Sequence, residues 1–185
     1  NVCAAQFAIA KKQTTLFRVH GEPEQTKLND LKSILAGFGI SFKLKGSENL
    51  APVLAKLIED TKDKPYLQTA ILRTMQRACY QPENIGHFGL QYPAYAHFTS
   101  PIRRYPDMMV HRLLARYLAG GKPADKTELE DLCARASDRE VVAAEAERAS
   151  IKYKMVEFMK EHIGEEFEGH ISGLTEWGVY VELDE

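Results

Sequence analysis

Residues 126–163 form the longest stretch of the chain with few helix breakers, and Gly164 follows directly after it. This pattern predicts one long α-helix that stops at the glycine. From Glu166 onward, apolar residues alternate with polar ones, which is typical of strands, and a turn divides the segment in two. We therefore expect a β-hairpin after the helix and a domain boundary near Gly164, which divides the chain into residues 1–163 and 164–185.

The rest of the chain alternates between helical and strand patterns. Apolar residues recur at helical spacing in several segments, as do the leucines of residues 28–35. Pro65 suits the first turn of a helix, and Gly37 suits the end of one. The predicted fold class is therefore α+β, mostly helical with a few short strands. We expect helices over residues 1–10, 24–36, 50–60, 65–80 and 100–118, a strand over 14–20, and a structured loop over 81–99.

The charge of the chain cancels in total but is divided along the sequence. The 24 basic and 26 acidic residues give a net charge of −2, which indicates no particular class of partner. Residues 125–168 hold thirteen acidic and seven basic residues, whereas residues 97–118 hold four arginines and one aspartate. A site for phosphate or nucleic acid must therefore be local. The acidic segment fits either a solvated helix face or a surface that docks a partner.

The cysteines exclude two classes of small protein. Cys3, Cys79 and Cys133 lie far apart, with no CxxC pair and no histidine at ligand spacing. They are typical of reduced thiols in a cytoplasmic protein rather than of a disulfide framework or a zinc site.

No stretch approaches the ~18 apolar residues of a membrane span, so we expect no membrane partner.

The start of the helix predicted over residues 100–118 has the features of an anion site. Thr99 or Ser100 is suited to cap this helix, and Pro101 to occupy its first position. A helix N-terminus offers unpaired backbone N–H groups and about half a positive charge. Two adjacent arginines at positions 103 and 104 add charge that can bind a phosphate through parallel hydrogen bonds. The sequence therefore predicts a phosphate site.

Other interpretations of this segment stay open. Arg103 and Arg104 can instead pair with acids of the long helix and hold it in place. Asp107 and His111 stand one helical turn apart and, with His97, are a conceivable metal site, although structural histidines with satisfied hydrogen bonds also explain them.

The same segment resembles the signature of the RNB family of exoribonucleases. Three further matches occur in the order that the family has, at residues 1–5, at 17–20, and in the loop over 86–97. The resemblance spans about residues 1–163. The matching signature reads His97-Phe98-Thr99-Ser100-Pro101-Ile102-Arg103-Arg104-Tyr105-Pro106-Asp107, followed by Val110-His111-Arg112.

The resemblance implies a fold for each end of the chain. Residues 1–163 would be the C-terminal portion of an RNB catalytic domain. Residues 164–185 resemble the first two strands of the OB-fold RNA-binding module that follows it, too few to close a barrel. In such folds exposed aromatics stack on bases, which would be the role of Trp177 and Tyr180 unless they fill the barrel instead.

The resemblance also implies an activity. Family members hydrolyse single-stranded RNA processively from its 3′ end, release nucleoside 5′-monophosphates and use Mg²⁺. Arg103 matches the catalytic arginine, which would stabilise charge on the phosphoryl oxygens as the bond breaks. Glu147 matches a glutamate near the active site of some members. The remaining RNA-binding positions implied are His97, Thr99, Ser100, Arg104 and Tyr105.

One feature of the family is missing from this sequence. The aspartate cluster that holds the metal in the family lies upstream of the matching segment, and the aspartates here stand apart. We therefore assign no metal ligand in this chain, expect it to be a piece of a longer protein whose upstream part is its partner, and expect the piece alone to be inactive. Two alternatives remain: a non-catalytic RNA-binding relative, and a helical regulatory module that docks a protein through its acidic helix. No DNA partner is expected.

Overall fold

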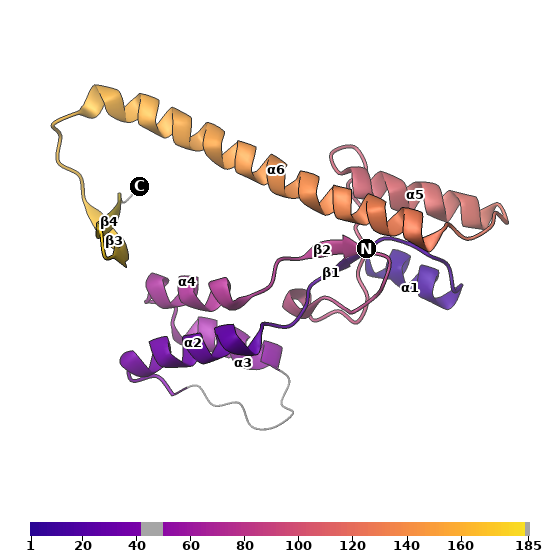
Figure 1. The fold of residues 1–185 in the computed structure, drawn as a ribbon, viewed down its shortest axis with the longest axis horizontal. Coiled ribbons are helices and arrows are strands. Elements are labelled where there is room, and N and C mark those ends of the chain that lie inside the picture. Colours follow the sequence, from indigo (N-terminus) through magenta and orange to yellow (C-terminus); the bar gives the residue numbers. More distant parts are fainter. Residues whose placement is uncertain (42–49, 184–185) are drawn as a thin grey trace. The chain divides into compact units, whose positions relative to one another are not determined.

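The computed structural model describes residues 1–41 and 50–183, which fall into two compact parts (Figure 1). The N-terminal part is residues 1–140 and the C-terminal part begins at residue 141, inside the long helix. The predicted boundary near Gly164 stays a prediction. The elements are α1 (Val2–Ala10), β1 (Phe17–Val19), α2 (Gln25–Gly37), α3 (Leu50–Asp60), α4 (Pro65–Thr74), β2 (Cys79–Gln81), the 3₁₀ turn η1 (Phe88–Leu90), α5 (Tyr105–Leu118), α6 (Lys126–Met159), the 3₁₀ turn η2 (Lys160–His162), β3 (Gly169–Thr175) and β4 (Gly178–Leu183).

Helices α2, α3 and α4 form one apolar core in the N-terminal part. Their buried side chains come from the helically spaced positions of the sequence, including Leu31 of α2, Leu54 of α3 and Ile71 of α4. Pro65 occupies the first turn of α4, as its missing N–H predicts. The α+β fold class, mostly helical with short strands, is confirmed.

A second core lies where the two short strands meet α5 and the start of α6. Strands β1 and β2 pair antiparallel, with Arg18 opposite Tyr80. Tyr80 is buried in a cluster that includes Met109 of α5 and Cys133 of α6. The side chain of Asp125 caps α6 by accepting a hydrogen bond from the Glu128 N–H at 3.0 Å. This core fixes the elements that surround the predicted anion site.

The helix predicted over residues 65–80 ends early. It stops at Thr74, whose hydroxyl donates to the Ile71 carbonyl, and Met75 is extended. Residues 79–81 form β2 instead, because β1 offers backbone partners that a lone helix end lacks. Long-range pairing has overridden the local helical pattern.

The helix predicted over residues 100–118 begins later than expected. Helix α5 starts at Tyr105, so Pro106 rather than Pro101 lies in its first turn, and neither Thr99 nor Ser100 caps it. Because Pro106 has no N–H to donate to Ile102, a helix that started earlier would lose a hydrogen bond there. The preceding residues form a separate turn.

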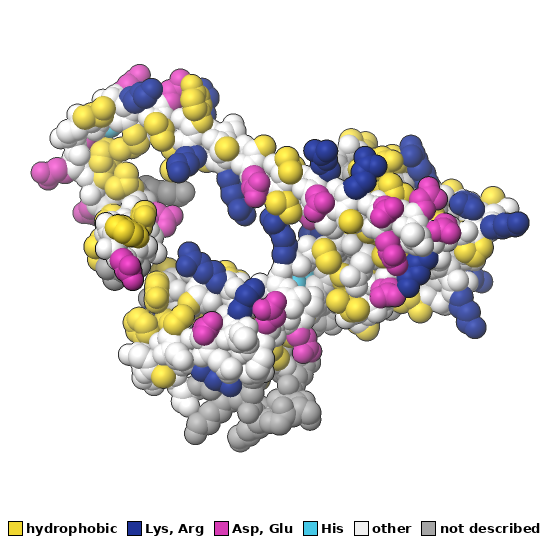
Figure 2. Space-filling view, viewed as in Figure 1, with side chains coloured by type: hydrophobic (Ala, Val, Ile, Leu, Met, Phe, Trp, Pro, Cys, Tyr) yellow, Lys and Arg dark blue, Asp and Glu magenta, His cyan; other side chains and the backbone are white. Residues whose placement is uncertain are grey.

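The C-terminal part consists of the second half of α6, η2 and a β-hairpin. Gly164 follows η2 with φ +97°, a conformation that favours glycine. Strands β3 and β4 pair antiparallel from Gly169↔Leu183 to Thr175↔Gly178, with a bulge near Ile171, and form no closed barrel among the described residues. Trp177 and several other apolar side chains of this hairpin are exposed. Figure 2 shows hydrophobic side chains on the surface of the C-terminal part.

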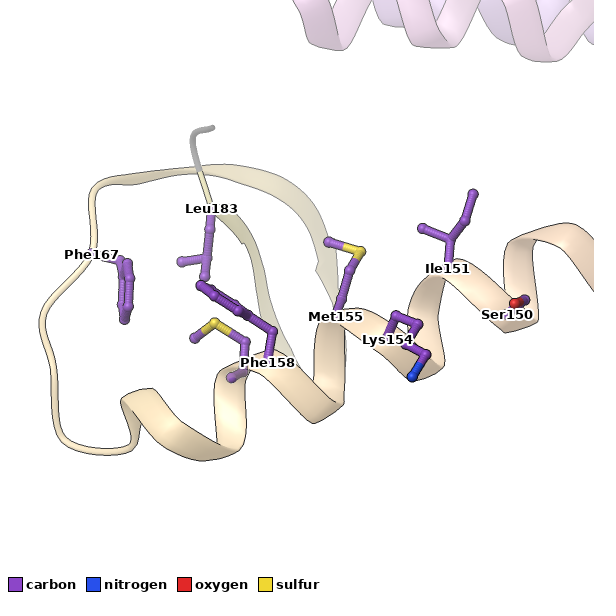
Figure 3. A pocket seen from close by; sticks show the side chains of 8 residues that line it. Ser150, Ile151, Lys154, Met155, Phe158, Phe167 and Leu183 are labelled. Atoms are coloured by element: carbon purple, nitrogen blue, oxygen red, sulfur yellow. The ribbon is translucent and has the colours of Figure 1, made fainter.

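An apolar groove lies within the C-terminal part (Figure 3). Among the described residues that line it, Ser150 and Lys154 are polar, and none carries a carboxylate or an imidazole. The groove therefore offers no such group for hydrolysis. Its apolar lining is Ile151, Met155, Phe158 and Met159 of α6 with Phe167 and Leu183.

In the part of the chain that the structure describes, no helix combines the length and the apolar content that a membrane span requires.

Neighbouring residues of α4 provide a test of the core. Ile71 is 0% exposed and its neighbour Leu72 is 60% exposed. We expect Ile71→Ala to lower the free energy of unfolding by about 2–5 kcal/mol, because it leaves a cavity, and Leu72→Ala to change it by less than about 0.5 kcal/mol. Urea unfolding followed by circular dichroism measures both. Equal effects of the two variants would contradict this core.

Candidate functional site

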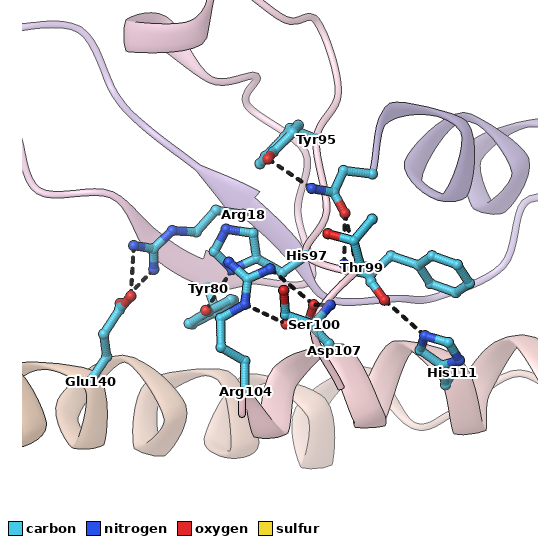
Figure 4. A network of polar contacts seen from close by, with 12 residues as sticks. Arg18, Tyr80, Tyr95, His97, Thr99, Ser100, Arg104, Asp107, His111 and Glu140 are labelled. Carbon is cyan, nitrogen blue, oxygen red and sulfur yellow. Dashed lines mark hydrogen bonds and ion pairs between the residues drawn. The ribbon is translucent and has the colours of Figure 1, made fainter. Parts of the chain in front are cut away.

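The predicted anion site is a turn over residues 100–104, in front of α5. Figure 4 shows the polar contacts of Ser100, Arg104 and Asp107. The Ser100 carbonyl accepts hydrogen bonds from the N–H groups of Arg103 at 3.3 Å and of Arg104 at 3.0 Å. The Ser100 N–H in turn donates to Oδ1 of Asp107 at 2.7 Å. The turn is thus closed on itself and tied to the first turn of α5.

Asp107 is the buried anchor of this arrangement. Its side chain is 0% exposed, and its Oδ1 also accepts from Nη2 of Arg104 at 3.0 Å. Arg104 Nε lies 3.0 Å from Asp107 Oδ2, so the two groups form a two-point ion pair although this second contact lacks hydrogen-bond geometry. A carboxylate in the first turn of a helix also faces the positive end of the helix dipole.

The two adjacent arginines therefore differ in exposure and in pairing. The side chain of Arg104 is 23% exposed and is paired with Asp107 of α5, not with an acid of α6. Arg103 is exposed, and it forms no hydrogen bond or ion pair through its side chain with any described residue. The interpretation that both arginines pair with the long helix is wrong for the described residues. The guanidinium of Arg103 is available to an anion.

Residues 98 and 99 are held by side chains from two helices. Asn1, at the start of α1, accepts from the Phe98 N–H at 2.9 Å and the Thr99 N–H at 3.2 Å through its Oδ1. His111 of α5 donates from Nε2 to the Phe98 carbonyl at 2.8 Å, and its ring stacks on the Phe98 ring. The hydroxyl of exposed Thr99 has no partner among the described residues.

This geometry decides between the interpretations of Asp107 and His111. The Asp107 carboxylate is paired with Arg104. His111 is a structural histidine, because its Nε2 is hydrogen-bonded to the Phe98 carbonyl. Among residues 1–41 and 50–183, no group of three His, Cys, Asp or Glu side chains could hold a metal ion.

A second polar network lies beside the turn. Arg18 of β1 donates to the Glu140 carboxylate of α6 from both terminal guanidinium nitrogens, Nη1 and Nη2, at 2.6 and 3.0 Å. The same guanidinium lies over the Tyr80 ring, 4.6 Å from its centroid. The Tyr80 hydroxyl and His97 Nδ1 share a hydrogen bond of 2.8 Å. Residues of β1, β2, α6 and the loop before α5 are thereby joined.

Burial keeps Tyr80 and His97 uncharged. It raises the pKa of Tyr80 to about 12, although the nearby Arg18 acts in the opposite direction. Burial also lowers the pKa of His97 to about 4, and the positive charges of Arg104 and Arg18 lower it further. At neutral pH, His97 thus contributes a hydrogen bond rather than a positive charge.

The sequence reasoning missed Arg18, Tyr80 and Glu140 as parts of this network. Arg18 and Tyr80 are brought together by strand pairing, and Glu140 lies 122 residues from Arg18. The position of Arg18 within a segment that resembles the RNB family was the available signal. Nothing in the local pattern distinguishes Glu140 from the other acids of α6.

The predicted site residues are divided between the two parts. His97, with residues 99–105, is in the N-terminal part, whereas Glu147, Trp177 and Tyr180 are in the C-terminal part. Glu147 is exposed, Trp177 is 92% exposed and Tyr180 is 59% exposed. In this hairpin both aromatic rings are therefore open to stacking. The functional roles assigned to these residues stay predictions.

Comparisons with known proteins agree on one family. The RNB domain matches residues 1–120. Ribonuclease R of Aquifex aeolicus is 45% identical over 177 residues, which cover 92% of this chain and 25% of that protein. Ribonuclease R of Escherichia coli is 38% identical over an alignment of 201 residues, which covers 100% of this chain and 24% of that protein. The chain thus spans about a quarter of the length of the curated relatives it matches.

Solved structures with a similar fold include an RNA complex. Mycoplasma genitalium RNase R in complex with ribose methylated single-stranded RNA matches with a TM-score of 0.82 and 30% identity, covering 100% of this chain and 30% of that one. Yeast Ssd1, described as a pseudonuclease, matches with a TM-score of 0.59 and 27% identity, covering 75% of this chain and 18% of that one.

The low pKa of His97 predicts how stability depends on pH. The folded-state pKa of about 4 lies below the ordinary value of 6.5, so the folded protein favours uncharged His97. The resulting stability is complete above pH 6.5 and is lost as the pH falls from 6.5 toward 4. We expect wild type to lose more stability than His97→Gln over this range in urea unfolding. An NMR titration that places the pKa of His97 near 6.5 would contradict the assignment.

Proposed function

The chain belongs to the RNB family, and from this premise we propose that it is part of a processive 3′-to-5′ exoribonuclease that hydrolyses single-stranded RNA to nucleoside 5′-monophosphates. The observation that carries the proposal is Arg103, which is exposed and has no side-chain partner among the described residues, on a turn held by hydrogen bonds to Ser100. Two relatives named ribonuclease R, and a similar structure with bound RNA, support it. That the chain is a piece of a longer enzyme is also part of the proposal, since it spans about a quarter of these relatives.

The proposed contribution of this chain to hydrolysis is electrostatic. The Arg103 guanidinium binds the oxygens of the scissile phosphate and stabilises the negative charge that grows as the bond breaks. The hydroxyls of Thr99 and Ser100 lie on the same turn and position the terminal nucleotide. Tyr105, the first residue of α5, is exposed and offers a ring for contact with a base or sugar. His97 supports the turn as an uncharged group.

The described residues do not fit a magnesium site. Mg²⁺ in proteins is held by carboxylates together with waters and substrate phosphates, and in residues 1–41 and 50–183 no group of three His, Cys, Asp or Glu side chains could hold a metal ion. No step of the reaction is therefore derived through the metal. We propose that the ligands of a magnesium ion, and the attacking water, are held by an upstream part of the same polypeptide, with Glu147 near the assembled site.

The hairpin of the C-terminal part is proposed as an RNA contact. Trp177 and Tyr180 are exposed on β3–β4 and its turn, as rings that stack on bases have to be. We propose that the hairpin is the start of an OB-fold module. RNA affinity should fall steeply with salt, because phosphate contacts release counterions.

The three scattered thiols favour a cytoplasmic location.

A second candidate is an RNA-binding relative that does not cleave. The match to yeast Ssd1, described as a pseudonuclease, favours it, because this fold also occurs in a protein of that description. Such a protein would keep the Arg103 anion site and lack the metal ligands. Turnover by the intact protein separates the two candidates.

Arg103 provides the first test of hydrolysis. In the intact protein, with Mg²⁺ and a 5′-labelled single-stranded RNA, we expect stepwise shortening from the 3′ end. Arg103→Ala should reduce kcat/KM by about 100-fold or more, equivalent to about 3 kcal/mol of transition-state stabilisation. Gel separation of the labelled products measures both direction and rate.

The control is Arg73→Ala, which removes an exposed arginine at the end of α4 and should leave the rate unchanged. The 185-residue chain alone should shorten no RNA. Turnover by this chain would contradict the proposal that the magnesium ligands lie in another part of the polypeptide. If the intact protein binds RNA but never shortens it, the non-catalytic candidate is correct.

Trp177 allows a direct test of base stacking. It is the one tryptophan of the sequence, so the intrinsic fluorescence of the chain near 350 nm reports on it alone. We expect single-stranded RNA to quench this emission at low salt and high salt to restore it. Trp177→Phe should bind with similar affinity, whereas Trp177→Ala should lose about 1–3 kcal/mol. Binding without any change in emission would exclude Trp177 as a stacking residue.

A further inference from the structure

The two arginines of the turn differ in what their surroundings allow them to do. Arg103 is exposed and has no side-chain partner among the described residues. Arg104 is three-quarters covered and forms an ion pair with a fully buried carboxylate. If Arg104 left this pair to bind a phosphate, the Asp107 charge would remain buried without its cation. Uncompensated buried charge is strongly unfavourable. Arg104 is therefore not free to act as a second phosphate ligand.

The same carboxylate controls the backbone on which Arg103 stands. Oδ1 of Asp107 accepts from the Ser100 N–H, and the Ser100 carbonyl accepts from the N–H groups of Arg103 and Arg104. The turn is thus held at both sides of Ser100. Without Asp107, the Ser100 N–H would lose its partner, and Arg104 would lose the anion that fixes its side chain.

We propose that Asp107 and Arg104 are a positioning pair, which holds the turn so that Arg103 alone presents its guanidinium to the scissile phosphate. This inference rests on the proposed function and assigns Arg104 a different role from the RNA contact predicted from the sequence. Asp107 and Arg104 act through Arg103 and touch no substrate.

The geometry explains why such a pair is needed. Arg103 follows an exposed Ile102, so no packing of neighbouring side chains restrains the tip of the turn. A displacement of about 1 Å at a catalytic group can cost about 100-fold in rate, so the backbone beneath Arg103 has to be fixed by other means. The Asp107 carboxylate also neutralises the cation next to Arg103, which directs the phosphate to one guanidinium.

A double-mutant cycle in the intact protein tests this role. Asp107→Asn keeps an oxygen for the Ser100 N–H but removes the charge that pairs with Arg104. We expect it to lower kcat on single-stranded RNA by about 10- to 100-fold with little change in KM. In the Arg103→Ala background, Asp107→Asn should change kcat by less than about 2-fold, because the group it positions is gone.

Arg104→Gln is the second variant; it keeps the Asp107 carboxylate but removes its cation. Arg104→Gln should match Asp107→Asn, and the combination of the two should be no worse than either alone. If Arg104 bound RNA itself, Arg104→Gln would instead raise KM and reduce the salt dependence of RNA binding by about one phosphate contact, with Asp107→Asn leaving both unchanged. That result would overturn the positioning role.

One control variant and one exchange measurement separate a positioning role from lost stability. Thr61→Val removes a buried hydroxyl bond to the Leu57 carbonyl in the α3 core, away from the turn, and should leave kcat unchanged. Amide hydrogen exchange of the intact protein should be faster at Ser100 in Asp107→Ala than in wild type.

The outcomes also distinguish this inference from the proposed function. If wild type shortens RNA and Arg103→Ala does not, the function stands. If Asp107→Asn then costs the same factor with and without Arg103, the pair is merely structural and the inference fails. If wild type shortens no RNA, the proposed function fails, and unchanged Ser100 exchange in Asp107→Ala would remove the positioning role as well.

Discussion

The pairing of β1 with β2 is the constraint on which the site depends. It places Arg18 directly opposite Tyr80, although these residues are far apart in the chain. From this point Arg18 reaches Glu140 of α6, and the Tyr80 hydroxyl reaches His97 in the segment that leads into the turn. A strand pair of three residues on each side thus joins α6 to the loop before α5. The turn has a fixed place because these three-residue strands hold its surroundings.

The helices that could be predicted are those whose pattern is local. Leucines at helical spacing in α2 and α3 correctly indicated the core, because burying one face is the main stabilising interaction of such helices. Two of the helix ends that differ from the prediction have non-local causes. Residues 79–81 leave the helical pattern because β1 provides partners for them. The start of α5 moves to Tyr105 because Pro106 needs a first-turn position and Asp107 binds Ser100 outside the helix.

The sequence predicted the location of the candidate site but not the pairing of its residues. Adjacent arginines near a helix start indicated an anion site, and Arg103 is exposed there. The sequence could not show that Arg104 is occupied, because its partner Asp107 fitted a metal site as well as an ion pair. Nor could it show which of the many acids of α6 binds Arg18, since this depends on the placement of α6 against the strands. Burial, which decides each case, is a property of the folded chain.

Among the described residues, the charges around the turn leave only one of the three arginines Arg18, Arg103 and Arg104 without an anionic partner. Glu140 neutralises Arg18, Asp107 neutralises Arg104, and the low pKa of His97 prevents it from adding another positive charge at neutral pH. An anion that approaches this surface is therefore attracted to Arg103 and not to its neighbours. Compensating the other two cations lowers the total attraction for an anion but leaves one guanidinium at which it can bind. In the proposed exoribonuclease, position would matter more than overall attraction, because only interactions that are stronger in the transition state raise the rate of the chemical step.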